Sequence, residues 1–458
     1  MPDSWSPGSW RALAPDQRPV FALDQQPEWP DRDALKAVLT ELGGLPPLIF
    51  AGEARNLKAE LARAAGGDAF VLQAGDCAET FREFSADRLR DGFKVILQMA
   101  AVLTYSAGVP VVKIGRVAGQ FAKPRSAGTE TIGDLTLPAY RGDMVNGLHF
   151  SEEARQPNPE NILQVYRQAA ATLNLLGGFA KGGFADLAEV HKWNMEFVRS
   201  SSEGQLYETI ASGIDRAMEF MRVCRVDLSP LREVNFYSSH EALILEYEEA
   251  LTRQDSTANN AWYDCSAHTL WIGTRTVQKR DSAHIEFLRG VGNPISFKVG
   301  HEMSPDHLLW LCEQLDPSRE AGRLTLISRM GREHVSDVLP GLVEAVRDSG
   351  HPVVWMCDPM HGNTFTSDGG YKTRSFDAIF DEITRYFEVH SALNTWPGGI
   401  HLELTGDDVT ECVGGPDDVK DSELHFQYVT ACDPRLNARQ SLDLAFRVAE
   451  LLERRPRH

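Results

Sequence analysis

The 458-residue sequence has a deficit of basic residues, no closely spaced cysteine pair and no long apolar run. Its 46 Lys and Arg residues stand against 65 Asp and Glu residues, which gives a formal net charge of −19. We therefore expect neither nucleic acid nor an anionic membrane as a partner, because each attracts proteins through a positively charged face. This balance does not exclude small anionic ligands.

The cysteines are few and scattered. The chain has seven of them, and none forms a Cys-x-x-Cys pair, which is typical of a reduced, cytoplasmic protein rather than of a disulfide framework. The first residues contain neither the basic nor the apolar region of a secretory signal, so we expect none. The uncharged stretch 95–112 contains Gln, Thr, Ser, Gly and Pro, and is better explained as a helix end followed by a buried strand than as a membrane span.

What the sequence does contain is eight short runs rich in apolar and β-branched residues, which alternate with amphipathic helical patterns. This alternation is typical of βαβ units, and eight such units close a (β/α)8, or TIM, barrel. We predict this α/β fold, with residues 1–66 as an N-terminal extension and residues 67–458 as the barrel that carries the chemistry. The predicted strands are 69–73, 109–114, 234–237, 269–272, 294–299, 324–327, 353–356 and 400–404.

The gap between the second and third predicted strands, about 120 residues, is too long for a single crossover connection of the kind that joins parallel strands. It predicts a helical insertion at about residues 150–232 in the barrel. Within it, helical patterns at 162–176 and 206–224 are separated by the glycine-rich segment 177–183, which we interpret as a flexible separator.

Cationic side chains gather at the predicted C-terminal ends of the strands, where a TIM barrel carries its chemistry. In an acidic protein, such a cluster favours the binding of small anions, above all phosphate and carboxylate, which arginine binds in a bidentate manner. The cations are Arg116, Lys123, Arg125, Arg275, Lys298 and Arg329.

A second set of residues at the same end has the chemistry of metal ligands. Cys77, His361 and Glu403 follow or end predicted strands, and Asp433 lies in a later loop. A thiolate, an imidazole and two carboxylates suit Mn, Co, Fe or Zn. Each residue alone has an ordinary structural explanation, such as a buried thiol, a turn residue or an ion-pair partner. Their common location favours a divalent metal site.

Long motifs run through nearly the whole chain, and in them the sequence resembles the class II 3-deoxy-D-arabino-heptulosonate 7-phosphate (DAHP) synthases, which open the shikimate pathway to the aromatic amino acids. The motifs are Gly75-Asp76-Cys77-Ala78-Glu79, Val112-Lys113-Ile114-Gly115-Arg116, Gly119-Gln120-Phe121-Ala122-Lys123-Pro124-Arg125-Ser126, Tyr140-Arg141-Gly142-Asp143, Ser239-His240-Glu241-Ala242-Leu243, Arg323-Leu324-Thr325-Leu326-Ile327-Ser328-Arg329-Met330-Gly331, Asp358-Pro359-Met360-His361-Gly362-Asn363-Thr364, Thr405-Gly406-Asp407-Asp408-Val409-Thr410-Glu411-Cys412 and Cys432-Asp433-Pro434-Arg435-Leu436-Asn437.

The resemblance implies a metal-dependent condensation of phosphoenolpyruvate with erythrose 4-phosphate, with manganese as the first expectation and cobalt, iron or zinc as alternatives. It also implies a homo-oligomer, either a dimer or a tetramer, with aromatic amino acids as effectors. It assigns the metal to Cys77, His361, Glu403 and Asp433, phosphoenolpyruvate to Arg116, Thr274, Arg275, Lys298 and Arg329, and the sugar phosphate to Lys123, Pro124, Arg125 and Ser126.

The proton-transfer group is left open by this resemblance. The candidate catalytic residues are Cys77, Lys298, His361 and Glu241. Glu241 is a candidate acid or base, and a role in an ion pair is an equal alternative for it. Because Cys432 adjoins the ligand Asp433, we also expect Cys432 to lie close enough to Cys77 for the two thiols to oxidise together.

The sequence departs from the family pattern after the fourth predicted strand. The family usually has Gly-Glu-Arg-Thr-Arg-Gln there, or Asp for Glu, whereas this chain has Gly273-Thr274-Arg275-Thr276-Val277-Gln278. One explanation is a secondary-metabolism enzyme that uses a modified aldose phosphate, such as an amino sugar phosphate; another is a position where only the backbone matters. A catalytically weakened regulatory subunit is a third interpretation, which the complete ligand and cation sets disfavour.

Overall fold

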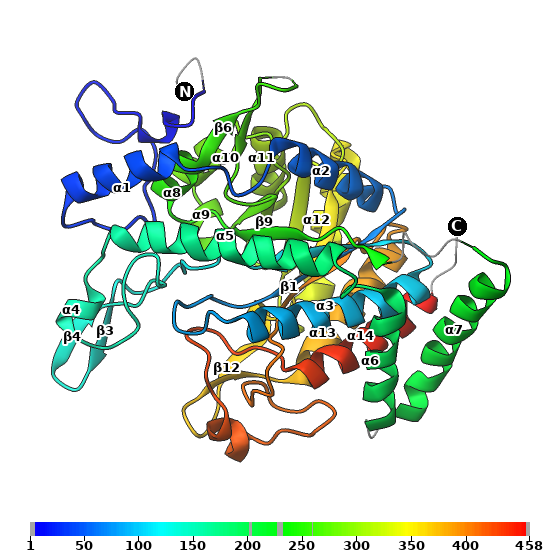
Figure 1. Ribbon diagram of the computed structural model, residues 1–458. Helices are drawn as coiled ribbons and strands as arrows, with labels where there is room; N and C mark the ends of the chain where they lie inside the picture. The colour runs from blue at the N-terminus through cyan, green and yellow to red at the C-terminus, as the bar shows by residue number, and fades with distance from the viewer. Residues whose placement is uncertain (1–4, 201–203, 227–231, 259, 455–458) are drawn as a thin grey trace.

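The computed structural model describes residues 5–200, 204–226, 232–258 and 260–454, so parts of the predicted extension and insertion lie outside the described residues. Eight parallel strands close into a barrel, which confirms the predicted TIM-barrel class (Figure 1). In hydrogen-bonding order the barrel strands are β1 (Phe70–Gly75), β14 (Gly399–Glu403), β11 (Val354–Cys357), β10 (Leu324–Arg329), β9 (Ile295–Gly300), β8 (Thr269–Ile272), β5 (Tyr237–Glu241) and β2 (Val111–Arg116).

Helices surround the barrel and extend it on one side. The helices are α1 (Arg32–Gly44), α2 (Ala51–Ala65), α3 (Ala86–Ala107), α4 (Glu152–Arg155), α5 (Glu160–Lys181), α6 (Leu187–Ser200), α7 (Gly204–Val223), α8 (Leu245–Leu251), α9 (Thr274–Val277), α10 (Ala283–Leu288), α11 (Pro305–Leu315), α12 (Val335–Ser349), α13 (Phe376–Ala392) and α14 (Ala438–Glu453). Three two-stranded antiparallel sheets lie outside the barrel: β3 (Thr129–Ile132) with β4 (Leu135–Pro138), β6 (Thr252–Gln254) with β7 (Trp262–Asp264), and β12 (Thr364–Thr366) with β13 (Lys372–Arg374).

The barrel strands are buried along nearly their whole length, as expected for a parallel sheet covered on both faces. The surrounding helices cover the strands with one apolar face each. In α14, the residues Leu444, Val448 and Leu452 are buried, and the helix packs along α3. This confirms the amphipathic pattern at the end of the chain.

The third barrel strand begins later than predicted. The prediction of a strand at 234–237 is wrong for all but its last residue, because β5 begins at Tyr237 and continues through Ser239 and His240 to Glu241. These polar residues belong to the strand because their side chains have buried partners, as in the hydrogen bond from Ser239 Oγ to the carbonyl of Gly115 at 2.9 Å. The polar residues 238–241, which we expected to follow the third strand, therefore form most of it.

Helices α5, α6 and α7 lie between β2 and β5, and Figure 1 shows α5 running across the outside of the barrel with α6 and α7 at one side. The interpretation of 177–183 as a separator is wrong for its first five residues, since α5 continues to Lys181. Packing explains the difference: Leu176 and Ala180 on this helix are buried in a cluster with Phe93 and Leu97. Burial of this face stabilises a helix that two glycines would otherwise weaken.

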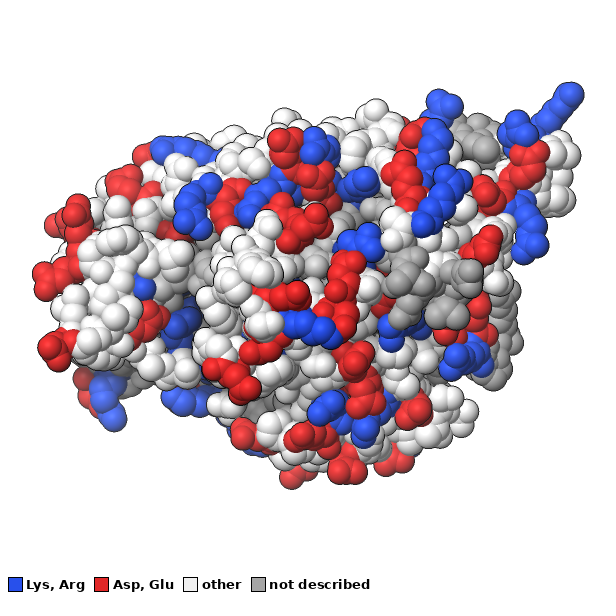
Figure 2. Space-filling model, turned by 90° about the horizontal axis from the view of Figure 1, so that it is seen from below, with Lys and Arg blue, Asp and Glu red and all other residues white. Residues whose placement is uncertain are grey.

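The described surface mixes charges of both signs. On the face in Figure 2, Lys and Arg side chains are interspersed with Asp and Glu. Among the helices formed by the described residues, none combines the length and hydropathy needed to cross a membrane.

Candidate active site

A cavity of about 90 Å³ lies at the C-terminal end of the barrel strands. Most of the residues singled out in the sequence meet there. Cys77, Glu403, Arg125 and Ser126 do not line it, although Cys77 contacts Asp433 and Glu403 lies 3.6 Å from Lys123, both in its wall. The predicted residues in its wall are Arg116, Lys123, Pro124, Glu241, Thr274, Arg275, Lys298, Arg329, His361 and Asp433.

The register of the sheet places the charged residues around Gly75. This glycine pairs with Arg116 of β2 on one side and with Glu403 of β14 on the other. Its φ is 146°, and a Cβ at this position would lie 2.7 Å from the Arg116 carbonyl oxygen, so there is no room for a side chain. The absence of a side chain at Gly75 lets the backbone turn directly after β1, two residues before Cys77.

Three of the four predicted metal ligands come together, and His361 adjoins one of them. One ligand atom each from Cys77, Glu403 and Asp433 lies within 4.8 Å of the others. His361 Nε2 lies 3.3 Å from Glu403 Oε1, and the backbone N–H of Asp433 donates to Cys77 Sγ at 3.0 Å. A thiol, an imidazole and two carboxylates at these separations form a donor set that fits a divalent transition metal.

Cations surround the carboxylate of Glu403. Arg116 Nη2 lies 2.8 Å from Oε1, and Arg374 Nη1 lies 2.8 Å from Oε2. Burial alone would raise the pKa of Glu403, but His361, Lys123 and Arg374 hold it well below its usual range. Arg374 was not predicted from the sequence. It lies on β13, in the hairpin formed by β12 and β13, and no motif in the neighbouring sequence indicates a site residue.

Lys123 lies between two of the predicted ligands. Its Nζ is 3.6 Å from Glu403 Oε1 and 3.6 Å from Asp433 Oδ2, and it is buried. Burial would raise the pKa of Asp433 as well, yet the Lys123 ammonium and the Arg374 guanidinium hold it far below its usual range. Both carboxylates are therefore ionised and ready to act as ligands.

Asp358 joins two predicted site residues. Its Oδ2 accepts from Lys298 Nζ at 2.6 Å and from His361 Nδ1 at 2.7 Å. Burial lowers the pKa of Lys298 to about 8, and Arg116 and Arg329 act in the same direction, whereas Asp358 opposes them. Asp358 was not predicted as a site residue, although its position directly after a strand, three residues before His361, was the available signal.

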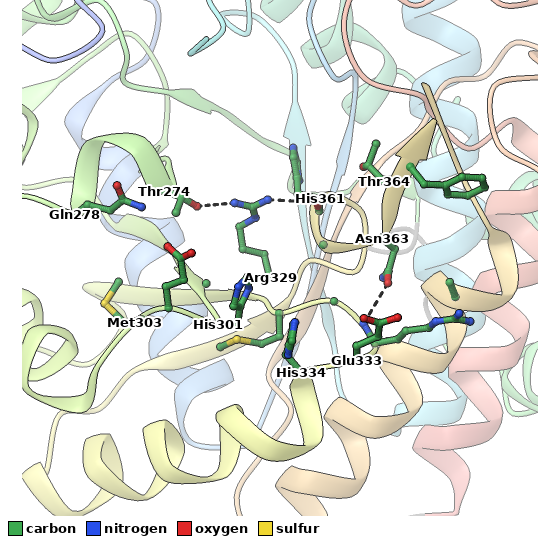
Figure 3. A pocket seen from close by; sticks show the side chains of 18 of the residues that line it. Thr274, Gln278, His301, Met303, Arg329, Glu333, His334, His361, Asn363 and Thr364 are labelled. Atoms are coloured by element: carbon green, nitrogen blue, oxygen red, sulfur yellow. Dashed lines mark hydrogen bonds between the residues drawn. The ribbon is translucent and has the colours of Figure 1, made fainter. Parts of the chain in front are cut away.

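Arg329 is fixed from two sides (Figure 3). Its Nη1 donates to Thr274 Oγ1 at 2.9 Å, and its Nη2 donates to the carbonyl of His361 at 3.2 Å. These three residues also border a larger cavity of about 1030 Å³ that opens beside the site. Thr274, the departure from the family pattern, thus stands between the two cavities and holds a cation of the inner one.

Glu241 is buried in the wall of the inner cavity. A Cβ on residue 273 would lie 2.4 Å from its Oε1, so the glycine at that position is what leaves room for the carboxyl group. Burial raises its pKa, although Lys123 and Lys298 act in the opposite direction. Within the described chain, Oε1 has no hydrogen-bond partner. Burial therefore favours the protonated form of this carboxyl group, and the neighbouring cations favour the ionised form.

The four-residue loop assigned to the sugar phosphate is divided. Lys123 and Pro124 face the cavity, whereas the Arg125 guanidinium pairs with Glu130 at 2.7 Å and Ser126 is exposed. The loop therefore presents one of its two cations to the site.

Cys432 is the neighbour of Cys77 that the sequence suggested. The two thiols are hydrogen-bonded, which lowers the pKa of Cys432, whereas burial and this same bond raise the pKa of Cys77. Both cysteines are free in this structure.

Comparison with known proteins gives a consistent result. The model of the Class-II DAHP synthetase family matches residues 5–449. A "Phospho-2-dehydro-3-deoxyheptonate aldolase" of Streptomyces coelicolor is 56% identical over 93% of this chain and 94% of its own. The "Phospho-2-dehydro-3-deoxyheptonate aldolase AroG" of Mycolicibacterium smegmatis is 50% identical over 93% of this chain and 92% of its own. A solved Francisella tularensis "Phospho-2-dehydro-3-deoxyheptonate aldolase" matches at 16% identity and a TM-score of 0.46, over 92% of this chain and 97% of that chain.

Proposed function

The chain belongs to the class-II DAHP synthase family, whose reaction condenses phosphoenolpyruvate with erythrose 4-phosphate to DAHP and phosphate, and we propose that the charged cluster at the barrel mouth carries out this first step of the shikimate pathway. The observation that carries the proposal is the meeting of Cys77, Glu403 and Asp433 within 4.8 Å, directly beside the anion-binding cations. In this proposal the divalent metal would lie beside the cavity whose cations take the two phosphorylated substrates.

Cys77, His361, Glu403 and Asp433 would hold the divalent metal, with manganese as the first candidate and cobalt, iron or zinc as alternatives. When bound, the metal supplies Lewis-acid polarisation of the aldehyde oxygen. Arg116 and Arg374 hold Glu403 in place through its two carboxylate oxygens. This leaves the position of one ligand fixed before any substrate enters.

Arg116, Arg275, Lys298 and Arg329 bind the phosphate and carboxylate of phosphoenolpyruvate in this proposal. In the described part of the chain, the Arg275 side chain has no hydrogen-bond or ion-pair partner, so it can take the phosphate without giving up a contact. Arg329 is already oriented by Thr274 and His361. Such preorganised cations neutralise the charge that develops as phosphate leaves.

Lys123, Pro124, Arg125 and Ser126 serve the sugar phosphate. The sugar then lies with its carbonyl carbon toward C3 of phosphoenolpyruvate, and these two carbons form the new bond. Water adds to C2, and phosphate departs. Burial raises the pKa of Glu241, and in this proposal the group holds or moves a proton at its Oε1 next to Gly273.

Two finer assignments belong to the same proposal. We infer a cytoplasmic homo-oligomer, a dimer or a tetramer, regulated by aromatic amino acids. The division into an extension at 1–66, a barrel at 67–458 and an insertion at about 150–232 gives these functions room outside the catalytic cavity. Activity measured with Phe, Tyr or Trp present, together with the mass of the particle in solution, tests both.

Loss of phosphoenolpyruvate in the presence of erythrose 4-phosphate and Mn²⁺ tests the reaction itself. Turnover supports the proposal, whereas a protein that binds Mn²⁺ but does not consume phosphoenolpyruvate would be the weakened regulatory subunit. The observation that favours a second candidate is Thr274, which replaces a family carboxylate beside Arg329. Turnover with an amino analogue of the aldose phosphate, and not with erythrose 4-phosphate, would establish that candidate.

A further inference from the structure

The N-terminal segment 22–26 crosses from one loop at the barrel mouth to two others. At one end, the backbone N–H of Ala22 donates to the carbonyl of Asp281, and the N–H of Ala283 donates to the carbonyl of Ala22. Asp24 pairs with Lys279 at 2.8 Å. These contacts tie the segment to the connection between α9 and α10, and the site residue Arg275 lies on α9.

Gln25 forms hydrogen bonds to the loop 123–126 through both the nitrogen and the oxygen of its side-chain amide. Its Nε2 donates to the carbonyl of Arg125 at 3.1 Å, and its Oε1 accepts from the N–H of Arg125 at 2.9 Å. Arg141 Nη2 in turn donates to the carbonyl of Gln25 at 2.6 Å. The φ of Gln25 is 64°, so the backbone adopts a left-handed conformation to aim this side chain.

Gln26 makes the corresponding contact with the loop after β5. Its Nε2 donates to the carbonyl of Leu243 at 2.7 Å, and its Oε1 accepts from the N–H of Leu245 at 3.1 Å. The segment therefore joins the loops that follow β2, β5 and β8. In each of these loops, or at the strand end before it, stands a residue of the candidate site: Lys123, Glu241 and Arg275.

The side chain of Arg125 is free to change partners while its backbone is held. Its side chain is 34% exposed and pairs with Glu130, whose other oxygen pairs with Arg155 at 2.8 Å. Arg155 is nearly buried and also donates to backbone carbonyls. If the Arg125 guanidinium moves away from Glu130, the Glu130 carboxylate still pairs with Arg155 and is not left without a cation.

We propose that Gln25 is a positioning residue for the aldose phosphate: it fixes the backbone of Arg125 so that the guanidinium can swing from Glu130 to the phosphate of the sugar. The inference rests on the proposed function, in which the loop 123–126 takes that phosphate. It assigns to the N-terminal extension a part in substrate selection. An aldose without a phosphate would gain nothing from this contact.

The test compares Gln25→Asn with Gln17→Asn. Asparagine tolerates a left-handed backbone and keeps the amide, but it is one methylene too short to reach Arg125. Gln17 lies in the same N-terminal extension, has a φ of 66° and an exposed side chain, and is the matched control. We expect Gln25→Asn to raise the KM for erythrose 4-phosphate about tenfold, the effect of losing two hydrogen bonds, with the KM for phosphoenolpyruvate unchanged. Gln17→Asn should leave both unchanged.

A double-mutant cycle separates positioning from general structural support. In an Arg125→Ala background, Gln25→Asn should raise the KM for erythrose 4-phosphate no further, because the guanidinium that Gln25 positions is gone. Fully additive effects, or an unchanged KM in Gln25→Asn, would overturn the role of Gln25. A wild-type protein that does not turn over erythrose 4-phosphate would instead contradict the reaction assigned to the chain.

Discussion

Lys298 and Asp358 form a buried ion pair, with Nζ 2.6 Å from Oδ2, at the centre of the anion-binding cations. This ion pair does not bring the pKa of Lys298 back to its usual value, because burial and the neighbouring Arg116 and Arg329 lower it to about 8. If Lys298 binds phosphoenolpyruvate as proposed, a pKa so close to neutral makes this binding sensitive to mild alkali.

The first prediction concerns this pH dependence. Lys298 loses its proton as the pH rises through about 8, and the free enzyme then has one cation fewer for an anionic substrate. We expect kcat/KM for phosphoenolpyruvate to fall above about pH 8, since this ratio reports the ionisation of the free enzyme. Lys298→Arg keeps its charge at high pH and should lose this limb of the profile. The same alkaline limb in both proteins would contradict the assignment.

The second prediction concerns the metal. Cys77→Ser removes the thiolate from the donor set, so we expect it to abolish metal-dependent activity and to weaken Mn²⁺ binding by more than about 100-fold. The melting temperature should stay close to that of the wild type, because only one atom changes and the serine hydroxyl can accept from the N–H of Asp433 as the thiol does. Titration calorimetry with Mn²⁺ measures the binding directly. Cys312→Ser, at a buried cysteine of α11, is the matched control. Full activity in Cys77→Ser would remove Cys77 from the metal site.

The third prediction follows from the contact between Cys77 and Cys432. A mild oxidant such as hydrogen peroxide takes two electrons from the two thiols, forms one disulfide and is itself reduced to water. We expect activity to fall on oxidation and to return with dithiothreitol, since the disulfide removes Cys77 as a ligand. Cys432→Ser should be protected from this reversible loss. Unchanged activity in the oxidised wild type would show that the disulfide does not form.

The architecture was predictable because buried strands alternate with amphipathic helices, which is typical of parallel α/β folds, and because eight such strands are the number that closes a barrel. The predicted DAHP synthase family is confirmed by the match over residues 5–449. Packing decided what local patterns could not: β5 extends through Ser239 and His240 because their side chains find buried partners. Arg374 could not be found at all, since only the folded hairpin brings it 2.8 Å from Glu403.

The fourth prediction tests the role of Thr274. Thr274→Val keeps the shape of the side chain but removes the hydroxyl that accepts from Arg329 Nη1 at 2.9 Å. Arg329 then loses one of its two anchors, and we expect the KM for phosphoenolpyruvate to rise by roughly ten- to 100-fold, the effect of one hydrogen bond to a charged group. Thr274→Ser keeps the hydroxyl and should behave as the wild type. Equal KM values for the valine and serine variants would show that the hydroxyl does not orient Arg329.

The fifth prediction concerns stability. Glu248 on α8 is fully buried, with Oε1 2.9 Å from His240 Nε2 and Oε2 accepting from Ser266 Oγ at 2.7 Å. Burial raises its pKa from 4.5 to about 8. Between these two values the folded protein binds one proton more than the unfolded chain, so the free energy of unfolding falls as the pH rises through this window.

Glu248→Gln removes this titration while keeping a donor and an acceptor. Relative to the wild type, the variant should therefore gain stability between about pH 5 and about pH 8, by about 1.4 kcal/mol for each pKa unit at most. Burial and the neighbouring Glu248 both raise the pKa of Asp264, so the same comparison is made in an Asp264→Asn background, where only Glu248 of this pair titrates. Urea unfolding at several pH values measures it, with the exposed Glu196→Gln as the control. Parallel pH dependences for the wild type and Glu248→Gln would mean that Glu248 is already ionised in the folded protein.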